Sequence, residues 1–264
     1  MFPRGRPARS LGGATKWAYL DHPGPIPFAH RGGSGERPEN TMGAFEHAVS
    51  LGFGYLETDV HSTADGVLLA FHDSVLDRVT DQRGAVAELP WAVVKKARIA
   101  SEPIALFEDL LGAWPDVRIN VDAKSDASVE PLMAALARTG AHDRVAIASF
   151  STRRLRRIRR LAAGRVCTAM APSEIARLRA GGYGLPTGRL RAAAAQVPLA
   201  HGRLRIVDEG FVAAAHRRGL VVHVWTVDSE SEMVRLLDLG VDGLMTDEPA
   251  LLKAVLQRRN QWFG

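Results

Sequence analysis

The sequence predicts an α/β protein with the fold of a TIM (β/α)8 barrel. Eight apolar, extended stretches alternate with stretches of helical apolar spacing, and polar residues gather where the extended stretches end. The 264 residues suffice for one such barrel. The expected strands begin near residues 26, 54, 117, 145, 165, 193, 220 and 242. An open, doubly wound sheet remains the alternative, because strand order is not visible in a sequence.

The first unit begins with an extended stretch over residues 26–30, which continues into a glycine-rich segment. Asn40 is the expected N-cap of a helix that ends near Leu51 and is followed by Gly52. Asparagine favours the first position of a helix, and glycine favours the position after its end. The segment therefore predicts a strand, a loop able to carry a site, and a helix.

The second strand is expected at residues 54–60, where Glu57 and Asp59 share one face because side chains alternate along a strand. Residues 61–104 depart from the regular repeat apart from an extended run at 67–71. They predict a small insertion after the second strand.

The later units return to the alternation of helix and strand. A strand at 117–124 places Asn120, Asp122 and Lys124 on one face. The remaining helices are expected at 106–113, 129–139, 152–161, 173–180, 209–218, 230–239 and 249–258.

Residues 1–25 predict an irregular lead-in to a single domain over residues 26–264. No stretch has the apolar length of a signal peptide or of a membrane span, so we expect a cytoplasmic protein without a transmembrane segment. Cys167 is the only cysteine and lies among apolar neighbours, which predicts a buried structural thiol in a reducing compartment.

A net charge of +5 favours anionic ligands but does not indicate nucleic-acid binding, and we expect no nucleic-acid partner. Six arginines between Arg153 and Arg160 surround Leu155 and Ile158. Helical spacing turns these two apolar residues inward and predicts a solvated outer face. A patch that contacts an anionic membrane or a nucleic acid is the less favoured alternative for these arginines, and the oligomeric state is unknown.

Three carboxylates lie on two strands whose ends a barrel would bring to one mouth: Glu57, Asp59 and Asp122. Taken singly, a carboxylate on a strand is more often part of a structural salt bridge. Three together at strand ends favour a metal site, because such ends carry the chemistry of this fold. Oxygen ligands select a divalent cation, Mg2+ or Ca2+.

Two histidines follow extended runs, His30 beside Arg31 and His72 beside Asp73. An imidazole exchanges a proton near neutral pH, so the two predict an acid and base pair. The other histidines lack such a setting and are expected at the surface or in packing: His22, His47, His61, His142, His201, His216 and His223.

Short motifs in this order resemble the glycerophosphodiester phosphodiesterase family. They are His30-Arg-Gly-Gly, Pro38-Glu-Asn-Thr, Ala44-Phe, Glu57-Thr-Asp-Val, Asp65-Gly, Phe71-His-Asp, Arg78-Val-Thr, Val224-Trp-Thr-Val and Thr246-Asp-Glu-Pro. They extend from residue 28 to about residue 250, and their combination is specific although no single motif is. The resemblance implies a TIM barrel with an insertion after the second strand.

The resemblance also implies roles for the residues in these motifs. His30 and His72 correspond to the general acid and base, Glu57 and Asp59 to metal ligands, and Arg31 to a phosphate-binding residue. The implied activity is metal-dependent hydrolysis of a glycerophosphodiester, a small-molecule substrate, to sn-glycerol 3-phosphate and an alcohol.

Four further residues complete the expected site. Asp122 occupies the place of a third metal ligand that is often glutamate in the family, so the ligand geometry remains open. Lys124 is expected to neutralise phosphate, and Trp225 to form an apolar wall for glycerol. Glu39 is expected to support His30 or the metal, with helix capping as an equal alternative.

Two other functions stay open at this stage. A lysophospholipase D would use the same site on a larger lipid and would need apolar surface near the mouth, for which the apolar residues of the insertion are the candidates. A noncatalytic phosphate-binding barrel is the second, and the presence of both histidines, both carboxylates of the second strand and Arg31 argues against it.

Overall fold

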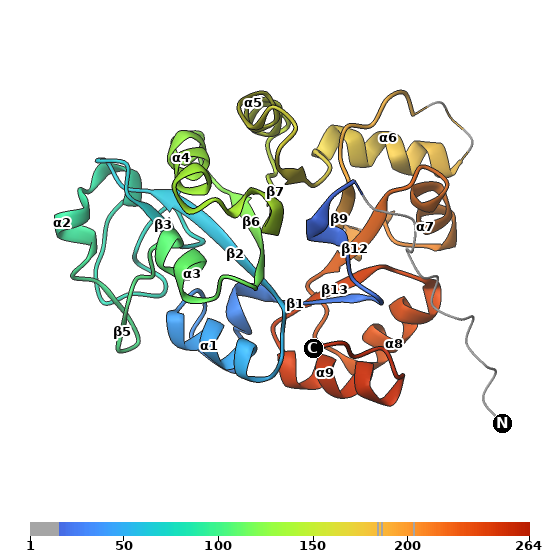
Figure 1. The fold of residues 1–264 in the computed structure, drawn as a ribbon, viewed down its shortest axis with the longest axis horizontal. Helices are drawn as coiled ribbons and strands as arrows, with labels where there is room; N and C mark the ends of the chain where they lie inside the picture. The colour runs from blue at the N-terminus through green and yellow to red at the C-terminus, as the bar shows by residue number, and fades with distance from the viewer. Residues whose placement is uncertain (1–15, 184, 186, 203) are drawn as a thin grey trace.

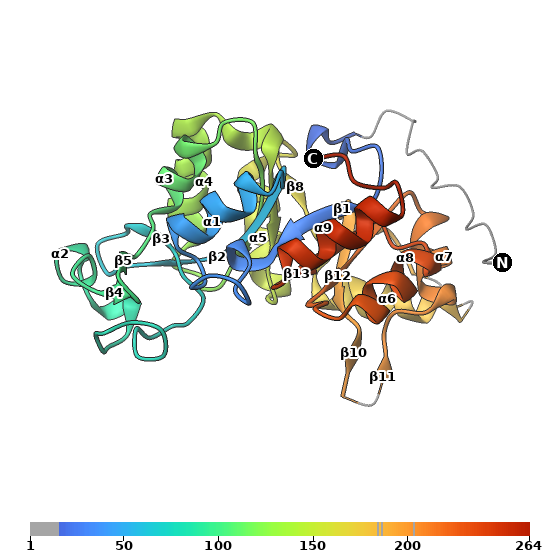
Figure 2. The same cartoon turned by 90° about the horizontal axis from the view of Figure 1, so that it is seen from below.

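The computed structural model describes residues 16–183, 185, 187–202 and 204–264. Within this part of the chain, parallel strands form a barrel that helices cover on the outside (Figure 1 and Figure 2). The barrel strands are β1 (Ile26–Ala29), β2 (Tyr55–Ser62), β6 (Arg118–Ala123), β7 (Val145–Ala148), β8 (Cys167–Thr168), β9 (Ala194–Pro198), β12 (Val221–Trp225) and β13 (Gly243–Thr246). They pair in the order β8-β7-β6-β2-β1-β13-β12-β9, and a parallel bridge between Ala169 and Ala194 completes the ring. The expected strands and the barrel are confirmed.

The helices follow the strands as the apolar spacing predicts. They are α1 (Met42–Ser50), α3 (Phe107–Ala113), α4 (Val129–Thr139), α5 (Thr152–Ala162), α6 (Pro172–Gly182), α7 (Glu209–His216), α8 (Glu230–Leu239) and α9 (Pro249–Arg258). On α5, Leu155 and Ile158 are fully buried, which confirms the inward apolar face between the arginines. The short antiparallel pair β10 (Ala200–His201) and β11 (Leu204–Arg205) projects from the barrel between β9 and α7 (Figure 2).

The expectation that Asn40 caps α1 is wrong. Thr41 is the N-cap, and its side-chain oxygen accepts a hydrogen bond from the backbone N–H of Ala44 at 3.1 Å. Asn40 has a positive φ of 56° and is buried, and its Oδ1 accepts a hydrogen bond from Thr58 Oγ1 at 2.8 Å. The Asn40 side chain therefore bonds the loop to β2 and does not cap the helix.

The interior of the barrel is apolar at the amino ends of the strands. Ile26, Phe28 and Tyr55 pack there with Tyr19 and Leu20, which belong to the 3-10 turn η1 (Ala18–Leu20). The hydroxyl of Tyr55 donates a hydrogen bond to the carbonyl of Tyr19 at 2.8 Å. This end of the barrel is thus filled by packed side chains, which leaves the opposite end for polar residues.

Toward the carboxyl ends, the interior becomes polar and then charged. Gln196 of β9 donates to Asn120 Oδ1 of β6 at 2.7 Å across the barrel. The register of β2 with β6 then pairs Asp59 with Asp122, one layer further along. Charged groups therefore gather at one mouth of the barrel.

The insertion follows β2, which extends to Ser62, slightly beyond the expected boundary. Its elements are β3 (Leu68–Ala70), η3 (Val86–Glu88), α2 (Trp91–Val94), β4 (Arg98–Ile99) and β5 (Glu102–Pro103), and β3 pairs antiparallel with β2. Leu76, Val86 and Val94 are fully buried in a cluster that belongs to the insertion. The insertion is therefore an ordered unit with its own small core.

Cys167 is 1% exposed, and burial raises the pKa of its thiol to about 12, which confirms the expected buried thiol. In the described ranges, no helix has both the length and the apolar character that crossing a membrane requires.

Candidate active site

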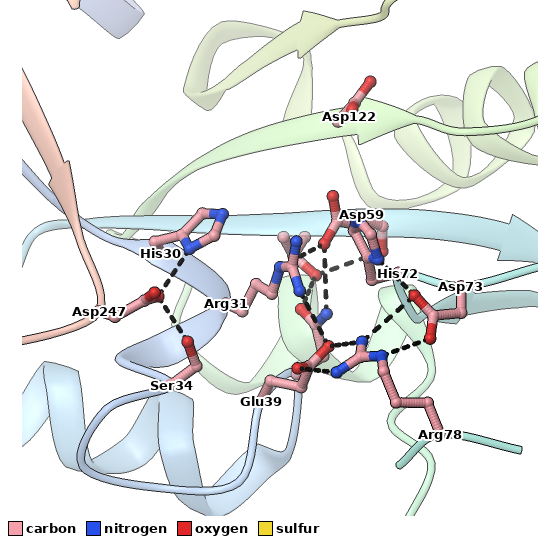
Figure 3. A network of polar contacts seen from close by, with 12 residues as sticks. His30, Arg31, Ser34, Glu39, Asp59, His72, Asp73, Arg78, Asp122 and Asp247 are labelled. Atoms are coloured by element: carbon pink, nitrogen blue, oxygen red, sulfur yellow. Dashed lines mark hydrogen bonds and ion pairs between the residues drawn. The ribbon is translucent and has the colours of Figure 1, made fainter. Parts of the chain in front are cut away.

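The side chains expected to perform chemistry lie at the carboxyl ends of the barrel strands. His30 follows β1, Asp59 lies in β2, and Asp122 lies in β6. Parallel strands bring their carboxyl ends to one face, where the sites of this fold are found. Figure 3 shows His30 and His72 on either side of Arg31 and Asp59.

The turn from β1 toward α1 depends on two glycines with positive φ. Gly32 has a φ of 84°, and a Cβ there would lie 2.8 Å from the Cβ of Ala44. Gly33 has a φ of 96°, and a Cβ there would lie 2.6 Å from Pro249 Cγ. A side chain at either position would collide with its neighbours, so the close turn requires glycine.

His30 lies between the carboxylates of Glu57, in β2, and of Asp247, which follows β13. Its Nδ1 is 2.7 Å from Asp247 Oδ1, and its Nε2 is 3.7 Å from Glu57 Oε2. The Ser34 hydroxyl donates to the same Asp247 oxygen at 2.5 Å, which fixes that carboxylate. Burial alone lowers the pKa of His30, but the charges of Glu57 and Asp247 outweigh it and raise this pKa above its usual value. Because Nδ1 of His30 is paired with Asp247, Nε2 is the ring nitrogen that faces Glu57.

His72 is held by a neighbouring side chain and through its own backbone. Its Nδ1 is 2.5 Å from Asp73 Oδ1, and its carbonyl accepts a hydrogen bond from His61 Nε2 at 3.1 Å. Burial lowers the pKa of His61, so His61 is a neutral donor here. His61 was expected in packing. In the structure, it holds the backbone of His72, which follows β3 and Phe71 and carries the second imidazole.

The two carboxylates of β2 are buried beside each other with different partners. Asp59 is 3.1 Å from Arg31 Nε and 2.8 Å from Lys124 Nζ. Although burial raises the pKa of Asp59, these two cations outweigh it and lower the pKa. Glu57 accepts a hydrogen bond from the backbone N–H of Arg31 at 3.1 Å. Burial, and next the charge of Asp59, raise the pKa of Glu57 to about 7.

Lys124 lies between the carboxylates of two neighbouring strands. Its Nζ is 2.8 Å from Asp59 Oδ1 and 2.8 Å from Asp122 Oδ2. Burial alone lowers the pKa of Lys124, but Asp122 and Asp59 outweigh it and raise this pKa. The ammonium is therefore a permanent positive charge between β2 and β6.

The oxygen donors at this mouth fit a hard divalent cation in their chemistry. Glu57 is 5% exposed with a carboxyl whose ionised form is disfavoured, and Asp122 Oδ1 is buried without a hydrogen-bond partner. A cation would relieve both conditions. In the part of the chain that the structure describes, no three His, Cys, Asp or Glu side chains are arranged as a complete ligand set. The ligand set therefore stays a prediction.

Arg31 reaches the mouth from a strained backbone position with φ of 51°. Its Nη1 donates to Glu39 Oε1 at 3.1 Å. Burial alone raises the pKa of Glu39, but hydrogen bonds from Arg78 and the charge of Arg31 outweigh it and lower this pKa. Glu39 is thus an ionised partner that orients Arg31, and it does not contribute to the cap of α1.

Trp225 ends β12 at the same mouth and is partly exposed. Its ring meets the ring of Phe150 edge to face, with centroids 5.6 Å apart. Phe150 is 64% exposed, and Lys124 Nζ lies 5.4 Å from the centroid of its ring. The two rings form an aromatic wall beside Lys124.

Several residues of this network were not assigned from the sequence. Asp247 holds His30, and Arg78 contacts both Glu39 and Asp73. Both belong to the quoted motifs, so their positions in those motifs were the available signal. The pairing of His30 with Asp247 was not visible, because 217 residues separate them.

Comparison with known proteins connects this geometry to one family. The model of the glycerophosphoryl diester phosphodiesterase family matches residues 30–251. A probable glycerophosphodiester phosphodiesterase 2 of Mycobacterium tuberculosis is 41% identical over 262 residues, which cover 97% of this chain and 99% of that protein. A glycerophosphodiester phosphodiesterase of Caldanaerobacter subterraneus is 31% identical over 85% of this chain and 95% of that protein.

The fold also has a solved counterpart. The structure of an Oleispira antarctica phosphodiesterase in complex with the product sn-glycerol-3-phosphate has a TM-score of 0.76 to this chain. It is 22% identical, and the similarity covers 92% of this chain and 100% of that one. This likeness shows that the two chains share the barrel fold.

Proposed function

We propose, since the chain belongs to the glycerophosphoryl diester phosphodiesterase family, that it hydrolyses glycerophosphodiesters to sn-glycerol 3-phosphate and an alcohol. The observation that carries this proposal is the pair of imidazoles at one barrel mouth. His30 is held by Asp247 and His72 by Asp73, and Arg31 lies between them (Figure 3). Two oriented imidazoles and a cation are what cleavage of an anionic diester needs.

Glu57, Asp59 and Asp122 are the residues that would hold a divalent cation, Mg2+ or Ca2+. Such an ion, when bound, supplies positive charge to the nonbridging oxygens of the phosphate. The protein contributes a buried carboxylate pair, and burial, followed by the charge of Asp59, raises the pKa of Glu57 to about 7.

The residues of the chain bind the phosphate and move protons. Arg31 and Lys124 present a guanidinium and an ammonium to the phosphate, and Trp225 packs against the glycerol carbons. One histidine accepts the proton of the attacking hydroxyl as its oxygen bonds to phosphorus. The other donates a proton to the alcohol oxygen as the bond from phosphorus to that oxygen breaks. The attacking hydroxyl is that of water, or that of the neighbouring glycerol carbon. In the second case a cyclic phosphate forms as the alcohol leaves, and water then opens it to sn-glycerol 3-phosphate.

The packing of the insertion favours a small substrate over a lysophospholipid. Leu76, Val86 and Val94, which would be needed to line an acyl groove, are buried in the insertion's own core. Val75 and Val93 are its exposed large apolar residues, at 39% and 44%. The insertion therefore offers little apolar area to an acyl chain.

The proposal is tested by assaying the purified protein on glycerophosphocholine, glycerophosphoethanolamine and lysophospholipids, with and without EDTA. We expect release of sn-glycerol 3-phosphate from the soluble diesters and its loss on chelation. Binding of these diesters without turnover, in the presence of Mg2+ or Ca2+, would identify a noncatalytic phosphate-binding barrel and overturn the proposal.

A further inference from the structure

Arg78, on the insertion, contacts two carboxylates that border the site (Figure 3). Its Nη1 and Nη2 donate to the two oxygens of Glu39 at 2.8 and 2.7 Å. Its Nε donates to Asp73 Oδ2 at 2.5 Å, and Nη2 also donates to Asp73 Oδ1 at 3.2 Å. One planar guanidinium thus binds a carboxylate of the β1 loop and a carboxylate that follows β3.

Each of these carboxylates has a second partner in the site. Glu39 Oε1 accepts from Arg31, and Asp73 Oδ1 contacts Nδ1 of His72. The pKa of Asp73 is lowered to about 2, and the hydrogen bond from Arg78 is the largest cause. Arg78 therefore binds the carboxylate partners of both the proposed phosphate-binding arginine and one of the proposed proton-transfer histidines.

The loop that carries Arg78 is fixed by the insertion. Leu76 is 1% exposed in the insertion's core, and its backbone N–H donates to the carbonyl of Gly84 at 2.9 Å. Asp77 Oδ2 accepts from the N–H of Gly84 at 3.0 Å, and Thr80 Oγ1 donates to the Leu76 carbonyl at 2.8 Å. The guanidinium is consequently presented from an ordered loop.

We propose that Arg78 is a positioning residue for the hydrolysis, and that through it the fold of the insertion fixes the distance between Arg31 and His72. The inference rests on the proposed function. A guanidinium binds two carboxylates in a fixed plane, which the point charge of a lysine does not do. Without Arg78, the like charges of Glu39 and Asp73 repel each other. Arg31 and His72 are then no longer oriented through one shared guanidinium.

The experiment compares Arg78→Ala, Arg78→Lys and a matched control, Arg138→Ala. Arg138 also uses its guanidinium fork on one carboxylate, that of Glu108, and is 59% exposed against 48% for Arg78. It lies on α4 and contacts α3, outside the described network. The readouts are kcat and KM for glycerophosphocholine, the melting temperature, and rescue by added guanidinium or ammonium ions.

We expect Arg78→Ala to lose about tenfold to a hundredfold in kcat/KM, with kcat reduced as well as KM raised, because both Arg31 and His72 shift. Guanidinium ions at concentrations that do not denature the control should restore part of the loss, because the place of the Arg78 side chain, which is 48% exposed, is accessible to solvent. Ammonium ions and Arg78→Lys should not. Arg138→Ala should keep the wild-type activity.

Two results would overturn the inference. One is an Arg78→Ala variant that keeps more than about half of kcat/KM, and the other is a loss that follows the fall in melting temperature and is not rescued. If the wild type releases no product, the proposed function fails. Calorimetric binding of sn-glycerol 3-phosphate then decides the role of Arg78, because equal affinities of wild type and Arg78→Ala would refute it.

Discussion

Replacing Glu57 by glutamine is expected to stabilise the metal-free protein at alkaline pH while it abolishes activity. Glu57 is 5% exposed, and burial, and next the neighbouring charge of Asp59, raise its pKa from 4.5 to about 7. The folded state therefore holds a proton that the unfolded state has already released between these two pH values. Through Glu57, the free energy of unfolding therefore falls as the pH rises through this interval. At higher pH the loss stays constant, because the carboxyl is ionised in both states.

The size of the effect follows from the same pKa. At about 1.4 kcal/mol for each pH unit, a rise from 4.5 to about 7 corresponds to about 3 kcal/mol. Glutamine has the shape of glutamic acid and no charge, so the advantage of Glu57→Gln should be near zero at about pH 4.5 and reach about 3 kcal/mol at about pH 8. Its Oε1 can still accept the hydrogen bond that Glu57 accepts from the N–H of Arg31.

The assay is urea unfolding in EDTA at these two pH values, with the exposed Glu46→Gln as control. Mg2+ or Ca2+ should then raise the stability of the wild type and have less effect on Glu57→Gln, because binding to the folded state stabilises it. A Glu57→Gln variant that is less stable than the wild type by the same amount at both pH values would refute the reasoning.

Three further predictions concern the chemistry and the surface. Losing His30 or His72 should cost roughly a hundredfold to ten-thousandfold in turnover while the fold persists, and only the variant of the acid should recover on an aryl ester with an activated leaving group; equal deficits on both substrates would remove the separate roles. kcat/KM should not rise with acyl length among lysophospholipids below their micelle concentrations, whereas a tenfold rise for every two or so methylenes, at about 0.8 kcal/mol each, would favour lysophospholipase D. Arg153 and Arg157 of α5 pair with Asp126 and Glu130, so cosedimentation with anionic liposomes should be weak, and strong salt-sensitive binding would instead show a membrane surface.

Much of the barrel could be predicted because local sequence patterns indicate its strands and helices. The alternation of Glu57 with Asp59, and of Asp122 with Lys124, reports a strand face directly. The position of Lys124 between Asp59 and Asp122 depends on the register of β2 with β6, which the sequence does not contain.

The parts of the site that were missed come from distant or exceptional positions. Asp247 meets His30 only because β13 closes the ring against β1. Asn40 looks like a helix cap, but the turn that buries it against Thr58 gives it a positive φ and leaves the cap to Thr41. Arg78 lies on the insertion, whose fold no barrel repeat predicts.

The central claim is tested most directly by following sn-glycerol 3-phosphate and choline released from glycerophosphocholine by the purified wild type and by His72→Ala. The account predicts that the wild type releases both products in equal amounts, that EDTA stops the release, and that added Mg2+ or Ca2+ restores it. Equal rates for the wild type and His72→Ala, or turnover that is unchanged by chelation, would contradict it.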